Sequence, residues 1–155
     1  MGIVITSGES VPIISEAFTR LKSILPENAF NGSTPAVGPS AFITDDSQVE
    51  RESLGIVWPD SRLLLCIFHY LQAWWRWLWG KKNSINKEDR IPIMNCIKRL
   101  LYSESPEFDK MYKDMSQNES SPFLYYDNAL KRLQEAYERR SEWAITFRRH
   151  ELTRA

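Results

Sequence analysis

The sequence predicts an α/β fold in which short strands alternate with helices, followed by a region that is all helix. Three observations carry this prediction: β-branched or leucine-rich runs of four to five residues, helix-period segments between them, and a change of texture near Gly80. The chain has 155 residues, of which 43% are hydrophobic and 26% are charged. This composition excludes a disordered or fibrous protein, and the length is enough to bury a real core.

Three runs are predicted to be strands: Gly2–Thr6, Ala41–Thr44 and Arg62–Cys66. The last contains three consecutive leucines, which suggests burial on both faces of the sheet. Because helical segments separate the runs, we expect an α/β unit with parallel strand pairing.

Two helices are predicted between these strands. From Pro12 onward, apolar residues fall on one face until Pro26 ends the helix. The second helix begins at Ser47, which forms a capping-box pattern with Glu50, and it ends where Trp58-Pro59-Asp60 follows Val57.

Beyond Cys66 the sequence predicts helices alone. Phe68–Trp79 is apolar around nearly its whole circumference, and Lys87–Tyr102 contains Pro92, so the latter helix is expected to start late or to kink. Ser103–Ser121 is polar with one short amphipathic stretch, and a single helical pattern runs from Tyr126 to Phe147.

The formal net charge is zero, which argues against a simple basic nucleic-acid clamp. The neutrality is a sum of two unlike halves: residues 1–80 hold 5 basic and 8 acidic side chains, and residues 81–155 hold 15 basic and 12 acidic ones. The N-terminus resembles no signal peptide, and the apolar stretch Leu63–Trp79 is short for a membrane span and interrupted by polar residues. We therefore expect no membrane association and an intracellular, reducing compartment.

Asp45 and Asp46 follow the strand Ala41–Thr44 directly. Ligands of open α/β sheets bind at the carboxyl ends of the strands, and carboxylates there can hold divalent metals for phosphoryl transfer. The simpler interpretation is that Asp45, Asp46 and Ser47 cap the following helix, and spacing alone favours the cap.

Cys66 and His69 form a C-x-x-H pattern at the junction of strand and helix. A structural zinc site needs four ligands, and Cys96 and His150 are the only other cysteine and histidine in the chain. A zinc module from these four residues is an open alternative, but we favour a buried thiol and a hydrogen-bonded core histidine and do not expect zinc.

Four tryptophans lie within Trp74–Trp79. Such a cluster could stack nucleobases, but a core role is the simpler interpretation. Helix geometry groups Trp74 and Trp75 with Leu71 and Leu78, so we expect these residues to be buried together.

Three basic pairs punctuate the last helical pattern, namely Lys131-Arg132, Arg139-Arg140 and Arg148-Arg149. They could contact phosphates. Glutamates lie among them at helical spacing, so intrahelical ion pairs are the simpler account.

These features occur together in one family pattern. The run Phe42-Ile43-Thr44-Asp45-Asp46-Ser47, then Glu50-Arg51, Val57-Trp58-Pro59 and Leu65-Cys66-Ile67-Phe68-His69, resembles MULE-type (Mutator-like) transposases. The resemblance covers roughly Gly2 to Phe147. It divides the chain into a partial RNase H-like core over residues 1–79 and a helical insertion over residues 80–155.

The resemblance implies a DDE-type catalytic core, in which three carboxylates hold two magnesium ions for phosphoryl transfer on DNA. Asp45 matches the second of these carboxylates, and Asp46 is its neighbour. Cys66 and His69 match the C-x-x-H element of the family. DNA is the implied partner, and the nucleus is the implied location.

The chain departs from the family at both ends, because the first catalytic Asp would lie upstream of Met1 and the last Glu beyond Ala155. We do not assign that last role to Glu142 or Glu151. One matching carboxylate cannot hold two metals, so we expect an inactive, transposase-derived fragment. The enzyme completed by a second chain remains the alternative.

The missing first strand would also leave an apolar strand edge unpaired, which invites pairing with another chain. Partners are therefore expected to be DNA, a related transposase chain or a second copy. We expect Gly2–Thr6 either to pair directly beside Ala41–Thr44 or to be poorly ordered.

Overall fold

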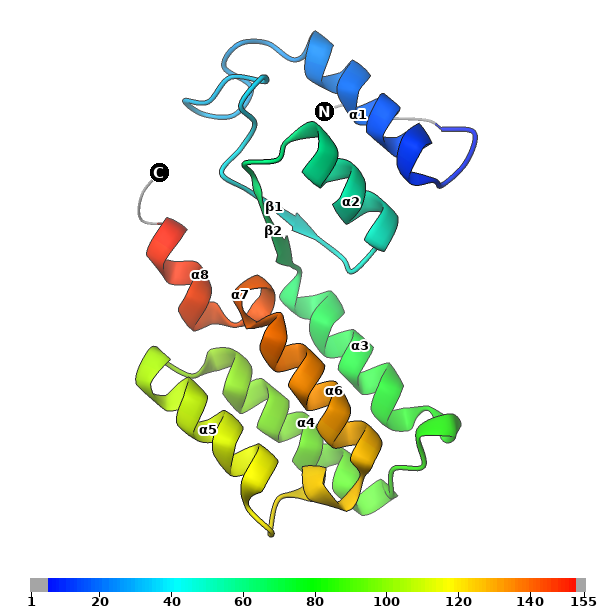
Figure 1. The fold of residues 1–155 in the computed structure, drawn as a ribbon, viewed down its shortest axis with the longest axis vertical. Coiled ribbons are helices and arrows are strands. Elements are labelled where there is room, and N and C mark those ends of the chain that lie inside the picture. Colours follow the sequence, from blue (N-terminus) through cyan, green and yellow to red (C-terminus); the bar gives the residue numbers. More distant parts are fainter. Residues whose placement is uncertain (1–5, 153–155) are drawn as a thin grey trace. The chain divides into compact units, whose positions relative to one another are not determined.

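The computed structural model describes residues 6–152, with side chains up to Arg148, and the chain divides into two compact units (Figure 1). The first unit ends at Cys66 and contains helices and a parallel sheet; the second begins at Ile67 and is helical. The mixed α/β class is confirmed. The finer RNase H-like assignment and the family-based boundary at Gly80 stay predictions.

The predicted strand over Gly2–Thr6 lies outside the described residues except for Thr6, which belongs to no strand or helix. Its pairing therefore stays a prediction. The first described element is helix α1 (Val11–Ile24), which has a proline in its first turn. It ends as predicted, since Leu25 is already extended (φ −69°, ψ 140°) ahead of Pro26.

The sheet of the first unit has two strands, β1 (Ala41–Thr44) and β2 (Arg62–Leu65), joined by helix α2 (Gln48–Val57). The strands pair in parallel, and the register places Phe42 beside Leu63. The predicted parallel pairing across a crossover helix is confirmed.

Trp58 is the centre of the first unit's core. Its side chain is 2% exposed, and the rings of Phe18, Phe30 and Phe42 have centroids 5.3 to 6.2 Å from its own. These residues come from α1, the loop after it and β1, and Trp58 itself ends α2. One indole therefore joins four segments of the unit, and its Nε1–H donates a hydrogen bond to the carbonyl oxygen of Pro35 at 2.9 Å.

Gly38 packs against this indole. Its φ is +89°, a left-handed conformation that favours glycine. A Cβ at this position would lie 2.3 Å from Cδ1 of Trp58. The loop before β1 therefore needs a glycine for both its backbone conformation and its packing.

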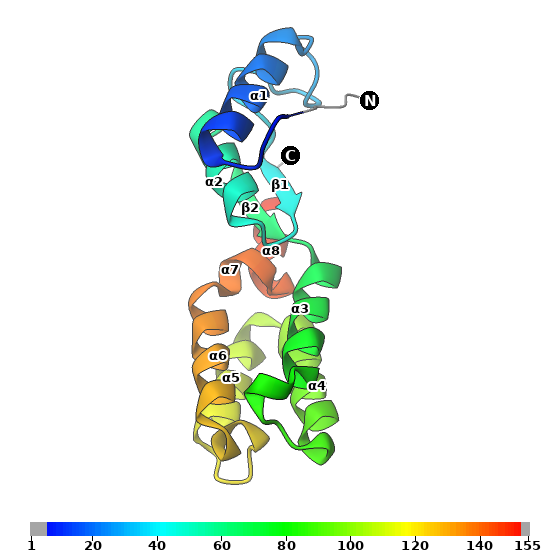
Figure 2. The same cartoon turned by 90° about the vertical axis from the view of Figure 1, so that its right-hand side faces the viewer.

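The second unit is a helical assembly whose long helices lie side by side in both views (Figures 1 and 2). Its core residues are spread over most of its helices, and many of them are completely buried. No helix within residues 6–152 is both long and apolar enough to cross a membrane. The elements are α3 (Ile67–Trp79), η1 (Lys81–Asn83), α4 (Lys87–Tyr102), α5 (Ser105–Gln117), η2 (Pro122–Tyr125), α6 (Asp127–Glu138), α7 (Arg140–Trp143) and α8 (Ile145–Leu152).

The helices differ from the expectations in three details. Helix α4 runs from Lys87 to Tyr102 with Pro92 inside it, so it does not start late, and the alternative of a kink at Pro92 stays a prediction. The polar stretch Ser103–Ser121 contains a full helix, α5, because Phe108 and Met115 are buried in the core. The single helical pattern from Tyr126 to Phe147 is three helices, since the backbone leaves the helical conformation at Ala144 and bends at Arg139.

Candidate functional site

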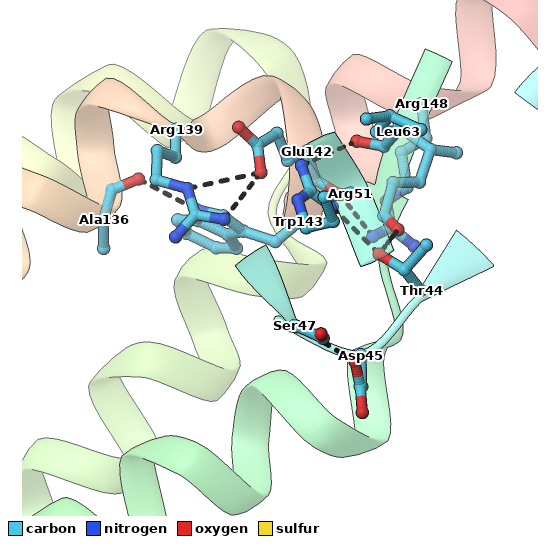
Figure 3. A network of polar contacts seen from close by, with 11 residues as sticks. Thr44, Asp45, Ser47, Arg51, Leu63, Ala136, Arg139, Glu142, Trp143 and Arg148 are labelled. Carbon is cyan, nitrogen blue, oxygen red and sulfur yellow. Dashed lines mark hydrogen bonds and ion pairs between the residues drawn. The ribbon is translucent and has the colours of Figure 1, made fainter. Parts of the chain in front are cut away.

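Asp45 lies immediately after β1, at the carboxyl end of the sheet, and its side chain is exposed. Its Oδ1 accepts a hydrogen bond from the backbone N–H of Ser47 at 2.9 Å (Figure 3). The Oγ of Ser47 in turn accepts from the N–H of Glu50 at 3.3 Å. Asp45 and Ser47 thus satisfy backbone donors at the start of α2, as the capping interpretation predicted.

Glu50 belongs to this site, although its position in the sequence predicts only a capping role. Burial raises the pKa of Glu50, and the charge of Asp45 raises it further, while the neighbouring Arg51 lowers it. Two carboxylates are therefore close together at the end of β1. The S-x-x-E pattern was the signal, because it places Glu50 one turn above the residues that precede the helix.

Arg51 connects α2 to both strands through hydrogen bonds. Its guanidinium donates to Oγ1 of Thr44 at 3.0 Å and to the carbonyl oxygen of Leu63 at 3.3 Å (Figure 3). The two acceptors lie on β1 and β2. This contact fixes the position of α2, and with it the turn that carries Asp45.

A two-magnesium centre needs more ligands than this turn supplies. Within residues 6–148, no group of three or more His, Cys, Asp or Glu side chains lies close enough together to hold a metal ion. The described residues therefore do not assemble the three-carboxylate centre that the resemblance implies, and the assignment of Asp45 as a remnant metal ligand stays a prediction.

The residues of the zinc alternative are placed separately. Cys66 is a half-buried free thiol just after β2, and His69 is an exposed residue of α3 whose ring meets that of Phe68. Cys96 is a half-buried free thiol on α4, and burial raises its pKa. The side chain of His150 lies outside the description. The expected buried, hydrogen-bonded role for His69 is wrong in one respect, because the ring is exposed to solvent.

The tryptophan-rich helix α3 is only partly core. Trp74 is 1% exposed and Leu78 is fully buried, as predicted. Trp75 and Trp79 are 44% and 37% exposed, so the prediction that Trp75 is buried was wrong. A helix that is apolar all round can bury only the sides that face neighbouring helices, and α3 has one side without such a neighbour among the described residues.

Three arginines of the basic pairs contact other groups within the protein. Arg139 forms an ion pair with Glu142 at 2.8 Å, as the spacing predicted (Figure 3). Arg132 lies over the rings of Trp74 and Trp77, and Arg140 lies over the ring of Tyr137. Cation–π contacts therefore hold two of these arginines, in addition to the ion pairs that the sequence predicts.

The arrangement at the end of β1 can position a carboxylate pair, but by itself it supplies neither a nucleophile nor a complete metal centre. Comparisons with protein-family models, with curated proteins and with solved structures found no match to this chain.

Proposed function

We propose that this chain is a transposase-derived protein that does not cut DNA and that acts by binding DNA or a related transposase chain. The observation that carries the proposal is the hydrogen bond that Asp45 accepts at the start of α2. Its carboxylate caps the turn that starts α2 and stands beside Glu50, whose pKa is raised. A carboxylate held in this way has a structural role without any metal.

The positions of the family-like motifs support the same proposal. Thr44 ends β1, Trp58 follows the last residue of α2, and Cys66 follows β2. The T-D-D, V-W-P and C-x-x-H patterns thus fall at successive element ends, where an α/β core changes direction. By the same resemblance we propose a nuclear location.

One observation favours the enzyme alternative. Asp45 is exposed at the carboxyl end of a parallel sheet, where ligands of α/β proteins bind. A second chain could bring further carboxylates to this edge. The described sheet has two strands, so each strand has one edge without a strand partner among residues 6–152.

The experiment is a cleavage assay on supercoiled plasmid with magnesium or manganese. It compares the wild type with Asp45→Ala, and Asp46→Ala serves as the matched control for losing one acidic side chain from this turn. We expect no cleavage above the protein-free blank for any of them. Cleavage by wild type and by Asp46→Ala that falls at least about tenfold in Asp45→Ala would establish the enzyme instead.

Binding is measured on the same samples. Fluorescence anisotropy with a labelled 30-base-pair duplex tests the DNA partner, and light scattering after gel filtration tests self-association. Protein that binds no nucleic acid and stays monomeric at high concentration would overturn the binding role.

A further inference from the structure

Helix α3 carries an exposed aromatic pair on the side that the core does not use. The rings of Trp75 and Trp79 stack with centroids 3.7 Å apart and an interplanar angle of 17°. Trp75 is the more exposed of the two. Two stacked indoles at the surface form an apolar platform on which a further planar ring can stack.

One cation contacts this pair, and four more lie close to it in the sequence. The guanidinium of Arg90, on α4, lies 5.6 Å from the ring centroid of Trp79. Arg76 precedes Trp79 by one helical turn, and Lys81 and Lys82 follow Gly80 at the end of α3. Lys87 lies one turn before Arg90 on α4.

Most of these cations are free to meet an external anion. Arg76, Lys81, Lys82 and Lys87 are exposed, and none forms an ion pair or side-chain hydrogen bond within the part of the chain that the structure describes. The segment 75–90 holds five cations and two carboxylates, Glu88 and Asp89.

One of the two carboxylates is already engaged. Oδ2 of Asp89 accepts a hydrogen bond from the hydroxyl of Tyr126 at 2.5 Å, and this hydroxyl accepts from the N–H of Asn86 at 3.2 Å. Asp89 thus ties the start of α4 to the residue that precedes α6. The surface around the tryptophans keeps a positive surplus.

We propose that this face, formed by Trp75, Trp79, Arg76, Lys81, Lys82, Lys87 and Arg90, binds single-stranded nucleic acid. A base stacks on the ring face of Trp75 that Trp79 does not cover, and the lysines and Arg76 contact the neighbouring phosphates. Stacking on an indole requires an unpaired base, because a duplex covers both faces of each of its bases. The inference deepens the proposed function and rests on it for the kind of partner, nucleic acid; the surface itself is argued from contacts of the second unit alone.

The test measures anisotropy of a labelled 20-nucleotide oligo-dT with the full chain, alongside oligo-rU and the duplex. We expect Trp75→Ala to weaken oligo-dT binding about tenfold or more, and Trp75→Phe to keep most of the affinity, since it retains a stacking ring. Tyr102→Ala is the matched control: it removes an exposed aromatic ring at the opposite end of α4 from Lys87 and Arg90, and we expect a change below about twofold.

The salt dependence of binding tests the role of the cations separately. Replacing both Lys81 and Lys82 by Gln should reduce the slope of log Kd against log salt by about 1.4, because each phosphate contact on a single strand contributes about 0.7. Replacing the exposed Lys110 and Lys113 of α5 by Gln should leave the slope unchanged. Far-UV circular dichroism checks that every variant keeps its helices.

The outcomes separate this inference from the proposed function. Duplex binding that Trp75→Ala does not affect, without oligo-dT binding, overturns the inference and leaves the proposed function standing. Oligo-dT binding that is insensitive to Trp75→Ala also overturns it. Binding to anionic phospholipid vesicles that needs Trp75, with no binding to any oligonucleotide, assigns the face to a membrane surface and overturns the inference; the proposed function falls with it only if the protein also stays monomeric.

Discussion

The two units of this chain build their cores in opposite ways. In the first unit one indole, Trp58, joins α1, β1, α2 and the loop before β1. In the second unit the core is shared among many fully buried side chains, among them Ile93, Leu100 and Leu133 from α4 and α6. A two-stranded sheet with two helices offers few positions that are covered on all sides. A single large ring therefore fills the core of the first unit, whereas many smaller side chains fill the core of the helical unit.

The largest expected effects come from removing one buried indole from each unit in turn. Trp58→Ala should lower the unfolding free energy of the first unit by about 3–5 kcal/mol and abolish the protection of its amide hydrogens from exchange. Hydrogen exchange followed by mass spectrometry should show full exchange over 41–65 and retained protection over 93–101. Trp58→Phe keeps a ring but loses the hydrogen bond to Pro35, and it should cost clearly less.

Trp143→Ala is the reciprocal variant. Trp143 is fully buried, stacks on Tyr70 at 4.6 Å and donates to the carbonyl oxygen of Ala136 at 2.8 Å. It should loosen the second unit and leave residues 41–65 protected. If either variant exchanges along the whole chain, the units unfold together and the contrast between them has no energetic meaning.

A pair of glycines sharpens the comparison inside the first unit. Gly38 and Gly32 both have positive φ, +89° and +101°, but only Gly38 faces the indole, and a Cβ on Gly32 would meet nothing within 4 Å. Gly32→Ala should therefore cost about 1–2 kcal/mol from backbone strain, and Gly38→Ala about 2–4 kcal/mol, because the ring must also move.

Urea unfolding, followed by fluorescence, measures both glycine variants. Gly55→Ala provides a control of opposite sign, since this glycine lies inside α2 with open space around its Cβ position, and alanine should stabilise it by about 0.5–1 kcal/mol. Equal losses for Gly38→Ala and Gly32→Ala would show that the packing on Trp58 adds nothing.

The sequence predicted best where the signal is local. Ser47 caps α2 and Pro26 follows the end of α1, because capping and proline chemistry depend on a few neighbouring residues. It predicted less where burial decides. Helix α5 has few apolar residues and depends on Phe108 being inserted into the core, a contact that periodicity does not reveal.

The candidate site shows the same limit. The cap formed by Asp45 and Ser47 follows from the spacing, whereas the clamp from Arg51 to Thr44 and Leu63 depends on how the strands pair. Similarly, the composition of α3 is apolar on all sides, so the sequence could not tell which tryptophans face water. The neighbours of the helix decide that Trp74 is buried and Trp75 is not.

The smallest expected effect is the pH dependence of stability that comes from the carboxylate pair Glu50 and Asp45. Burial and the charge of Asp45 raise the pKa of Glu50 above its ordinary value of 4.5. The folded state therefore holds this proton more tightly than the unfolded state. Its stabilising effect is complete below pH 4.5 and is lost as the pH rises through the raised folded pKa.

Glu50→Gln should remove this dependence, because the amide does not titrate. The difference in unfolding free energy between wild type and variant should change by less than about 1 kcal/mol between pH 4 and pH 7, since Glu50 is half exposed to water. Asp45→Asn should weaken the dependence without abolishing it, as it removes the charge but leaves the burial. Glu52→Gln, on the exposed side of α2, corrects for losing one negative charge from the helix. The contrary result is that the unfolding free energies of wild type, Glu50→Gln and Asp45→Asn all follow the same pH dependence. In that case the two carboxylates do not interact, and Asp45 acts in this turn as a cap alone.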